Sequence, residues 1–277
     1  MIMINKVPYE IQYFPDGTLN MTNLDIYNLT QYNLHMNNMR ITINWKYSNP
    51  IEQVVIYNLV NHFRDKWNIK YISLDMPYVP NARMDRTKKQ FSEIHTLKYF
   101  CKFINDLQFD KVTVLDVHSH ITNTLLDRCS EIYPTYYITE AIKQSYADCI
   151  LFPDKGAYDR YKDMCSKEKL PILYGEKIRC WETGKITGYE IKNPANLQIT
   201  RDLNCLIIDD ICSYGGTFHH ATNALFNLGI EYIYLYITHC ENNILKGDAI
   251  NNSNLKHIYT TDSIFTEQHD KITVFEL

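Results

Sequence analysis

The sequence lacks several patterns that mark common classes of protein. Its eight cysteines are scattered and form no C-x-x-C pair, so neither a zinc site nor a redox pair is supported. No apolar run is long enough to span a membrane, and the amino terminus has no signal-peptide pattern. Low-complexity tracts and long linkers are also absent. We therefore expect reduced cysteines and a cytoplasmic protein without a membrane partner.

The sequence also has no excess of basic residues over acidic ones. The chain has 28 Lys and Arg against 32 Asp and Glu, a formal net charge of −4. Surfaces that bind nucleic acids or anionic membranes usually carry a basic patch. We therefore expect small-molecule substrates and no nucleic-acid partner. A length of 277 residues allows one or two domains with substantial cores.

Helical and strand patterns alternate along most of the chain. Amphipathic stretches predict helices at 54–67, 92–107, 138–147 and 219–228. Short apolar stretches predict strands at 69–74, 112–117, 149–152, 170–174 and 205–208. This alternation is typical of α/β proteins with mostly parallel sheets flanked by helices. We predict two such units, residues 1–132 and 133–277, divided in a turn-like stretch at 129–134.

Residues 205–217 are the most informative segment. An apolar run predicts a buried strand that ends at Ile208, and two carboxylates, Asp209 and Asp210, follow it. Next come Ser213, Tyr214, Gly215, Gly216 and Thr217. A Gly-Gly-Thr turn before a helix offers backbone N–H groups, a hydroxyl and the positive helix end to a phosphate. A ribose phosphate supplies both a phosphate and hydroxyls for the carboxylates, whereas the alternative is a solvated turn after a strand.

Two further groups of polar residues follow predicted strands. Arg83, Asp85 and Arg86 come after the strand at 69–74, and arginine suits planar contacts with phosphates and bases. The alternative for them is a solvated surface turn. Asp116 and His118 lie at the end of the strand predicted at 112–117. Strand alternation predicts that these two residues and residue 120 face one side, where a divalent cation could bind. The alternative here is a capped strand end.

Taken together, and in their order along the chain, the motifs of this sequence resemble those of the phosphoribosyl pyrophosphate (PRPP) synthetases, also called ribose-phosphate pyrophosphokinases. The segment at 205–217 resembles the PRPP-binding loop that they share with type I phosphoribosyltransferases. Residues 77–86 resemble their Pro-Tyr-x-x-x-Ala-Arg-x-Asp-Arg segment beside the ATP site. Residues 14–18 resemble the loop that closes on adenine, 153–156 the Pro-Asp-x-Gly loop, and 177–179 the Lys-x-Arg pair. The resemblance covers roughly residues 12–265, with the chain shortened at both ends relative to the family.

The resemblance implies two type I phosphoribosyltransferase-like domains, the first on the ATP side and the second on the ribose-phosphate side. It implies Mg²⁺-dependent transfer of the β,γ-pyrophosphoryl group of ATP to the anomeric hydroxyl of a ribose 5-phosphate unit, releasing AMP. ATP would contact Phe14, Asp16, Arg83, Asp85 and Arg86, and magnesium would contact His118 and Asp154. Lys177 and Arg179 would stabilise the transferring group. Asp209, Asp210 and residues 213–217 would bind the ribose phosphate. Because the adenine loop often comes from a neighbouring subunit in this family, a homo-oligomer is expected.

Several departures from the family pattern leave alternatives open. Thr18 and Met84 stand where the family usually has glutamate and glutamine. Ser213 replaces an acidic residue and Tyr214 adds an aromatic surface, which would suit a longer acceptor such as ADP-ribose and a role in NAD resynthesis. Two other classes are a phosphoribosyltransferase that consumes PRPP and a non-catalytic, synthetase-associated regulatory protein.

Overall fold

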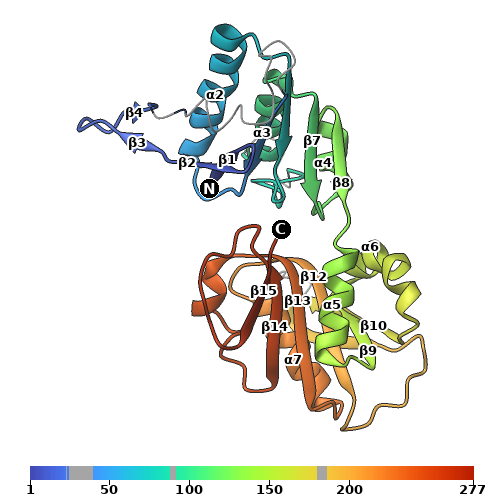
Figure 1. Cartoon of the computed structure of the whole chain (residues 1–277). Coiled ribbons are helices and arrows are strands. Elements are labelled where there is room, and N and C mark those ends of the chain that lie inside the picture. Colours follow the sequence, from blue (N-terminus) through green and yellow to red (C-terminus); the bar gives the residue numbers. More distant parts are fainter. Residues whose placement is uncertain (23, 25–39, 88–91, 180–185) are drawn as a thin grey trace. The chain divides into compact units, whose positions relative to one another are not determined.

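The computed structural model divides the chain into two units, Met1–Tyr133 and Pro134–Leu277 (Figure 1). It describes residues 1–22, 24, 40–87, 92–179 and 186–277, and at 177–179 and 186–187 it describes the backbone alone. The division falls one residue from the boundary predicted near residue 132. The α/β class predicted for both units is confirmed. None of the helices in the described ranges is long and apolar enough to cross a membrane.

The first unit is built on one six-stranded sheet. Its described elements are β1 (Ile2–Ile4), β2 (Val7–Tyr9), β3 (Gln12–Tyr13), β4 (Leu19–Asn20), β5 (Arg40–Trp45), α2 (Ile51–Trp67), β6 (Tyr71–Asp75), α3 (Thr96–Asp106), β7 (Lys111–Leu115), α4 (His120–Leu125) and β8 (Cys129–Ile132). The sheet order is β2-β1-β5-β6-β7-β8, with β5 to β8 parallel and β1 antiparallel to both of its neighbours. The hairpin of β3 and β4 is separate from this sheet.

Helices α2 and α3 pack on this sheet because each carries an apolar stripe at helical spacing. In α2 the buried positions include Val55, Ile56, Leu59 and Phe63, and they share one core cluster with strand residues such as Ile43. The helix ends at Asn68, whose φ of 51° is left-handed, a conformation that asparagine tolerates. The core of the first unit therefore lies between its helices and the buried face of its sheet.

The second unit is built on a seven-stranded sheet. Its elements are α5 (Thr135–Ser145), β9 (Cys149–Phe152), α6 (Lys155–Cys165), the 3₁₀ turn η2 (Ser166–Glu168), β10 (Ile172–Arg179), β11 (Ile186–Lys192), β12 (Asn204–Cys212), α7 (Gly216–Asn227), β13 (Tyr232–Cys240), the 3₁₀ turn η3 (Asn242–Lys246), β14 (Leu255–Thr261) and β15 (Ile272–Phe275). The order is β11-β10-β9-β12-β13-β14-β15. All neighbouring pairs are parallel except β10 with β11.

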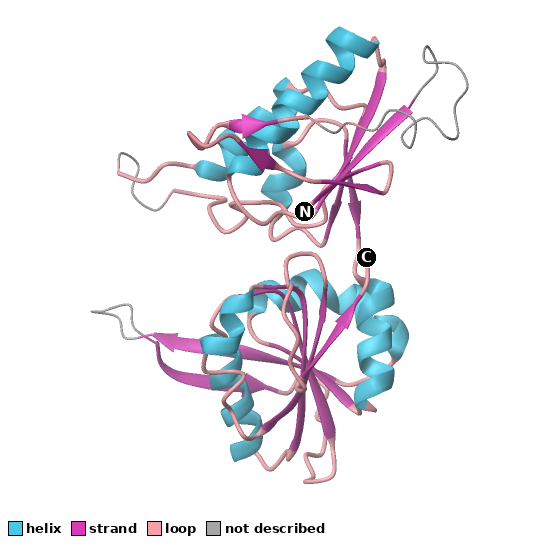
Figure 2. Ribbon diagram, turned by 60° about the vertical axis from the view of Figure 1, so that its left-hand side comes forward, coloured by secondary structure: helices cyan, strands magenta, loops and turns pink. Residues whose placement is uncertain are grey.

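Helices cover both faces of this second sheet (Figure 2). Along β12, Cys205 and Ile207 pack in one cluster with α7, whereas Leu206 and Ile208 pack in another with α5 and α6. All four residues are fully buried. This two-sided burial explains why the strand appears in the sequence as a continuous apolar run rather than an alternating one.

Among the boundary predictions that were wrong, two are informative. Strand β12 continues to Cys212, so Asp209 and Asp210 lie inside the strand and not beyond its end. The stretch at 129–134 was expected to be irregular but contains β8. That strand lies at the edge of its sheet and has no fully buried residue, so it lacks the apolar signal by which strands are recognised.

Candidate functional site

The phosphate loop predicted at 213–217 connects β12 to α7. Gly215 has a φ of 81°, and α7 begins at the next residue, Gly216. A Cβ atom at Gly215 would lie 2.5 Å from the Cβ of Ala249, so only glycine fits here on both conformational and steric grounds. The Tyr214 carbonyl accepts a hydrogen bond from the Asp248 N–H at 3.0 Å. The loop is therefore held against residues 247–249, with the first N–H groups of α7 at its end.

The two adjacent carboxylates of β12 have different environments. Asp210 is only 3% exposed, and its Oδ2 lies 3.0 Å from Nη1 of Arg160 in α6. Asp209 is partly buried and accepts a hydrogen bond from the Asp210 N–H at 3.0 Å. Burial, together with the negative charges of Asp210 and Asp154, raises the pKa of Asp209 well above its ordinary value. The proximity of these three carboxyl groups therefore disfavours ionisation of Asp209, and a bound cation would relieve that penalty.

Asp154 lies at the amino end of α6, directly after β9. Its Oδ1 accepts a hydrogen bond from the Ala157 N–H at 3.1 Å, which caps the helix. The hydroxyl of Tyr189, from β11, donates to the Pro153 carbonyl at 2.9 Å. Burial, and then the negative charges of Asp154 and Asp209, raise the pKa of Tyr189, so its hydroxyl remains protonated. The structure thus brings Asp154, Asp209 and Asp210 together within the second unit.

Lys177 and Arg179 lie near the end of β10. Their backbones pair with Tyr189 and Ile186 of β11, and the register shifts between Ile178 and Arg179. The extended conformation predicted for this segment is confirmed. The side chains of both residues lie outside the described part of the chain, so their predicted roles stay predictions.

Phe14 and Asp16 lie in the tight turn that connects β3 to β4. Gly17, in the same turn, has a φ of 83°. The N–H and the hydroxyl of Thr18 both donate to Oδ1 of Asp16, at 3.0 and 2.7 Å. These hydrogen bonds, the one from the hydroxyl first, lower the pKa of Asp16. Thr18 therefore closes its own turn, and the Phe14 side chain is 51% exposed and accessible to a ligand.

Arg83, Asp85 and Arg86 lie in the irregular segment that follows β6. Asp85 is 5% exposed, and its Oδ1 lies 3.2 Å from Nε of Arg86, whose side chain is 77% exposed. Arg83 is exposed as well. The buried carboxylate thus orients one of two outward-facing guanidinium groups, which is an arrangement suited to binding an anion.

The predicted alternation of Asp116, His118 and His120 on one strand face was wrong. Strand β7 ends at Leu115, Asp116 has a left-handed φ of 45°, and α4 begins at His120. The Asp116 N–H donates to the carbonyl of Ile132 at 3.0 Å, which holds this turn. Because the backbone turns at Asp116, the period of two that the prediction assumed does not apply. His118 is partly buried in the turn before α4.

No protein-family model matches the chain, but curated proteins and solved structures do. The ribose-phosphate pyrophosphokinase of Pyrococcus abyssi is 29% identical over 241 residues, covering 85% of this chain and 77% of that protein. The enzyme of the same name from Saccharolobus solfataricus is 24% identical over 279 residues, covering 99% and 90%. Over most of its length the chain is therefore similar to proteins named ribose-phosphate pyrophosphokinase.

The comparison with solved structures concerns the fold. The crystal structure of phosphoribosylpyrophosphate synthetase from Mycobacterium smegmatis matches with a TM-score of 0.75 at 15% identity, covering 96% of this chain and 85% of that one. At this level of identity the match shows the fold alone. The two α/β units described above therefore share their fold with that synthetase.

Two residues of this candidate site were missed by the sequence analysis. Arg160 is a single arginine on a helix with ordinary amphipathic spacing, and nothing local marks its contact with Asp210. Tyr189 lies 35 residues beyond Asp154 in the sequence, on a strand that was not predicted. The one local signal was Gly175, because a glycine inside a strand often marks a place where another group lies close to the backbone. In the structure that group is the Tyr189 side chain.

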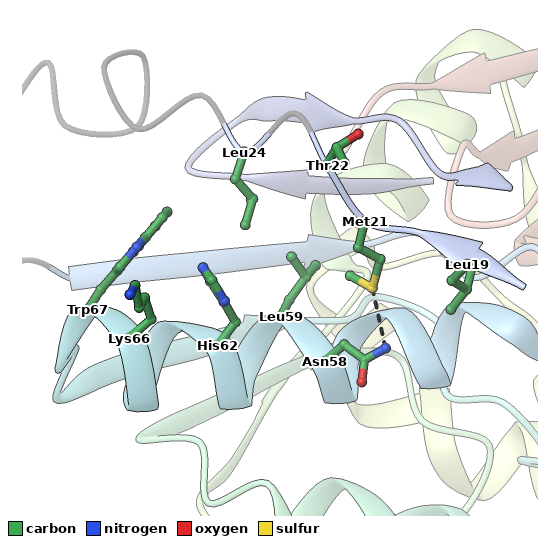
Figure 3. Close-up of a pocket in the computed structure, with 9 residues that line it drawn as sticks. All are labelled: Leu19, Met21, Thr22, Leu24, Asn58, Leu59, His62, Lys66 and Trp67. Atoms are coloured by element: carbon green, nitrogen blue, oxygen red, sulfur yellow. Dashed lines mark hydrogen bonds between the residues drawn. The ribbon is translucent and has the colours of Figure 1, made fainter. Parts of the chain in front are cut away.

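Two pockets in the described part of the chain are lined by other residues. A pocket of about 510 Å³ lies over α2 (Figure 3), and it is lined by Leu19, Met21, Thr22, Leu24, Asn58, Leu59, His62, Lys66 and Trp67. A second one, of about 570 Å³, lies between β11 and α7 and includes Tyr189, His220 and Asn223. Neither contains a residue that was predicted to bind a ligand.

Proposed function

We propose that this protein transfers the β,γ-pyrophosphoryl group of ATP to the anomeric hydroxyl of a ribose 5-phosphate unit. In this reaction the anomeric oxygen forms a bond to the β-phosphorus, the bond from that phosphorus to the α,β-bridging oxygen breaks, and AMP leaves. The proton of the hydroxyl goes to solvent or to the departing AMP. The products are PRPP, or a PRPP-like compound, and AMP.

The observation that carries this proposal is the combination of a phosphate loop and paired carboxylates at the carboxyl end of β12. The loop at 213–217 presents the first N–H groups of α7, which suit the 5-phosphate. Asp209 and Asp210 lie a few residues before it in the chain and suit the 2- and 3-hydroxyls of the ribose. Arg160 forms an ion pair with Asp210 at 3.0 Å and helps to hold that carboxylate in place.

A magnesium ion fits the donors of the second unit. Mg²⁺ is usually held by one or two carboxylates, with phosphates and waters completing its coordination. Asp154 supplies such a carboxylate, and a cation beside it would also relieve the repulsion among acidic groups that helps to raise the pKa of Asp209. The described residues contain no cluster of three or more His, Cys, Asp or Glu able to hold a metal by themselves, so the substrate phosphates would complete the site. When bound, the ion would neutralise charge on the transferring phosphates.

On the nucleotide side, we propose that Arg83 and Arg86 bind the ATP phosphates, with Asp85 orienting Arg86. Phe14 would stack on adenine from the hairpin turn that Asp16 and Thr18 close. His118 would contact magnesium-bound water, since imidazole is a poor direct ligand for Mg²⁺. Lys177 and Arg179 would stabilise the charge that develops on the transferring group. We also propose a homo-oligomer, with the Phe14 turn serving a neighbouring subunit.

The test is AMP release from ATP and Mg²⁺ with ribose 5-phosphate, together with mass spectrometry of the product. We expect stoichiometric AMP and a product heavier than the acceptor by one pyrophosphoryl group. Lys177→Ala should lower kcat at least 100-fold, on the scale of lost transition-state charge stabilisation. Lys143→Ala, which removes an exposed lysine of α5, is the matched control and should leave the rate unchanged. Formation of pyrophosphate from PRPP and a free base would instead identify a phosphoribosyltransferase, and nucleotide binding without turnover a regulatory protein.

One observation favours ADP-ribose as a second candidate acceptor. The Tyr214 side chain is 55% exposed although its carbonyl is held by the Asp248 N–H. An exposed aromatic ring on the held backbone of the phosphate loop offers a stacking surface to the adenine of a longer acceptor. Base stacking of this kind is worth about 1–3 kcal/mol.

Comparison of acceptors tests this second candidate. If ADP-ribose is used, Tyr214→Ala should lower kcat/KM for it by about 5- to 100-fold, from the stacking energy, and leave kcat/KM for ribose 5-phosphate within about twofold. Tyr136→Ala removes a tyrosine that is 69% exposed on α5 and serves as the control. A wild-type protein that consumes only ribose 5-phosphate would rule out ADP-ribose.

A further inference from the structure

The hairpin of β10 and β11 carries Lys177 and Arg179, and most of it lacks support from the rest of the sheet. Strand β10 pairs with β9 only from Ile172 to Tyr174. From there to Arg179, β11 is its one paired neighbour in the described part of the chain. Figure 2 shows this hairpin extending away from the body of the second unit. An isolated two-stranded hairpin is marginally stable in water, so its position depends on side-chain contacts.

Tyr189 supplies such a contact. Its backbone pairs with that of Lys177, and its hydroxyl donates to the Pro153 carbonyl at 2.9 Å. The side chain therefore reaches from β11 across β10 to the residue that follows β9. Pro153 directly precedes Asp154, whose Oδ1 caps α6 at 3.1 Å.

Gly175 makes this crossing possible. A Cβ atom there would overlap the Tyr189 hydroxyl oxygen and would lie 2.8 Å from the Pro153 oxygen. The φ of Gly175 is not positive, so glycine is needed here for space and not for backbone conformation. An aromatic ring lying over a cross-strand glycine also fixes the register of the two strands.

We propose that Tyr189 is a positioning residue that fixes the Lys177 hairpin against the loop carrying Asp154. This inference rests on the proposed function, because it takes the roles of Lys177 and Asp154 from there. Lys177 and Asp154 act on the same pyrophosphoryl group, so their separation must be held within a fraction of an ångström. A displacement of about 1 Å in such a pair can lower a rate about 100-fold.

The test is Tyr189→Phe, which keeps the ring over Gly175 and removes only the hydrogen bond to Pro153. We expect kcat to fall about tenfold or more, with KM for ribose 5-phosphate within about twofold, because the phosphate loop is untouched. Hydrogen–deuterium exchange should be faster in the amides of β10 and β11 and unchanged in α7. Tyr174→Phe is the matched control, since its ring packs on Tyr158 and its hydroxyl makes no hydrogen bond to the described residues.

The outcomes separate this proposal from the proposed function. If the wild-type protein releases no AMP, the proposed function fails, but exchange in the hairpin still decides whether Tyr189 holds it. Unchanged exchange in the hairpin, or an unchanged kcat in an active protein, would overturn the proposal. So would faster exchange throughout the second unit, or equal effects of Tyr189→Phe and Tyr174→Phe, because either result indicates a general stability role. Gly175→Ala, which forces the phenol off Pro153, should reproduce the kinetic effect of Tyr189→Phe.

Discussion

The phosphate loop depends on the absence of a side chain at Gly215, and Gly215→Ala tests this dependence. The φ of 81° costs an L-residue about 1–2 kcal/mol. The new methyl group would lie 2.5 Å from the Ala249 Cβ, whereas carbon atoms in favourable contact are about 3.5–4.0 Å apart. Separating them requires a shift of at least ~1 Å in a buried contact, and overpacking of this kind costs about 1–3 kcal/mol. We therefore expect a total destabilisation of about 2–5 kcal/mol.

The steric part of this effect can be separated by a second substitution. Ala249→Gly removes the opposing methyl group, so the double variant should recover about 1–3 kcal/mol relative to additivity. The assay is native-state hydrogen exchange of the α7 amides, which reports the stability of this element within the intact chain. The KM for ribose 5-phosphate should rise about 10- to 100-fold in Gly215→Ala, as one charged hydrogen bond to phosphate is worth about 1.5–3 kcal/mol.

Gly229 provides the matched control within the same unit. Its φ is 105°, and a Cβ there would meet no atom within 4 Å. Gly229→Ala should therefore show the backbone cost alone, with no coupling to Ala249→Gly and no change in KM. Strictly additive effects of Gly215→Ala and Ala249→Gly would refute the steric argument. An unchanged KM would refute the assignment of this loop to the phosphate.

Three other predictions concern single contacts. Arg160→Met should destabilise the second unit by about 2–3 kcal/mol, measured by urea unfolding, because it leaves buried Asp210 without its cation; a loss below ~0.5 kcal/mol would contradict this. Burial alone would raise the pKa of Glu52, but hydrogen bonds from neighbours such as Trp45 outweigh it and lower that pKa below 4.5. At a pH above 4.5, wild type should therefore be more stable than Glu52→Gln by about 1–3 kcal/mol. This difference should disappear as the pH falls through the lowered pKa of Glu52, and a difference that does not change with pH would disprove the prediction. Thr18→Val should return the lowered pKa of Asp16 towards its ordinary value, as followed by carboxyl NMR titration, and an unshifted curve would count against the Thr18 hydrogen bond.

The repeating elements were predictable from the sequence because their signals are local. The apolar stripe of α2 predicted a helix at 54–67, and the structure has one at Ile51–Trp67. The strand predicted at 149–152 is β9, with the same bounds. Both signals come from residues a few positions apart, and burial against the sheet enforces them. By contrast, β8 is an edge strand whose residues are not fully buried, so nothing in its composition distinguished it from a turn.

The candidate site was predictable only where a motif is continuous in sequence. The Gly-Gly-Thr turn at 215–217 could be recognised because a left-handed glycine before a helix is a local requirement. The alternation assumed for Asp116 and His118 failed because one positive φ ended it, and an aspartate gives little warning of such a conformation.

The sequence by itself determined the alternation of helices and strands, the order of the motifs and their resemblance to ribose-phosphate pyrophosphokinases. Each of these depends on residues that are close together in the sequence, because hydrophobic periodicity and turn preferences are local properties. The tertiary structure alone decided that Arg160 meets Asp210, that Ala249 closes on Gly215 and that Tyr189 crosses Gly175 to reach Pro153. The two residues of each contact, Arg160 with Asp210, Ala249 with Gly215 and Tyr189 with Pro153, lie 34 to 50 residues apart in the chain. They meet because strand order and register in the second sheet bring their elements together, and short-range patterns do not encode either property.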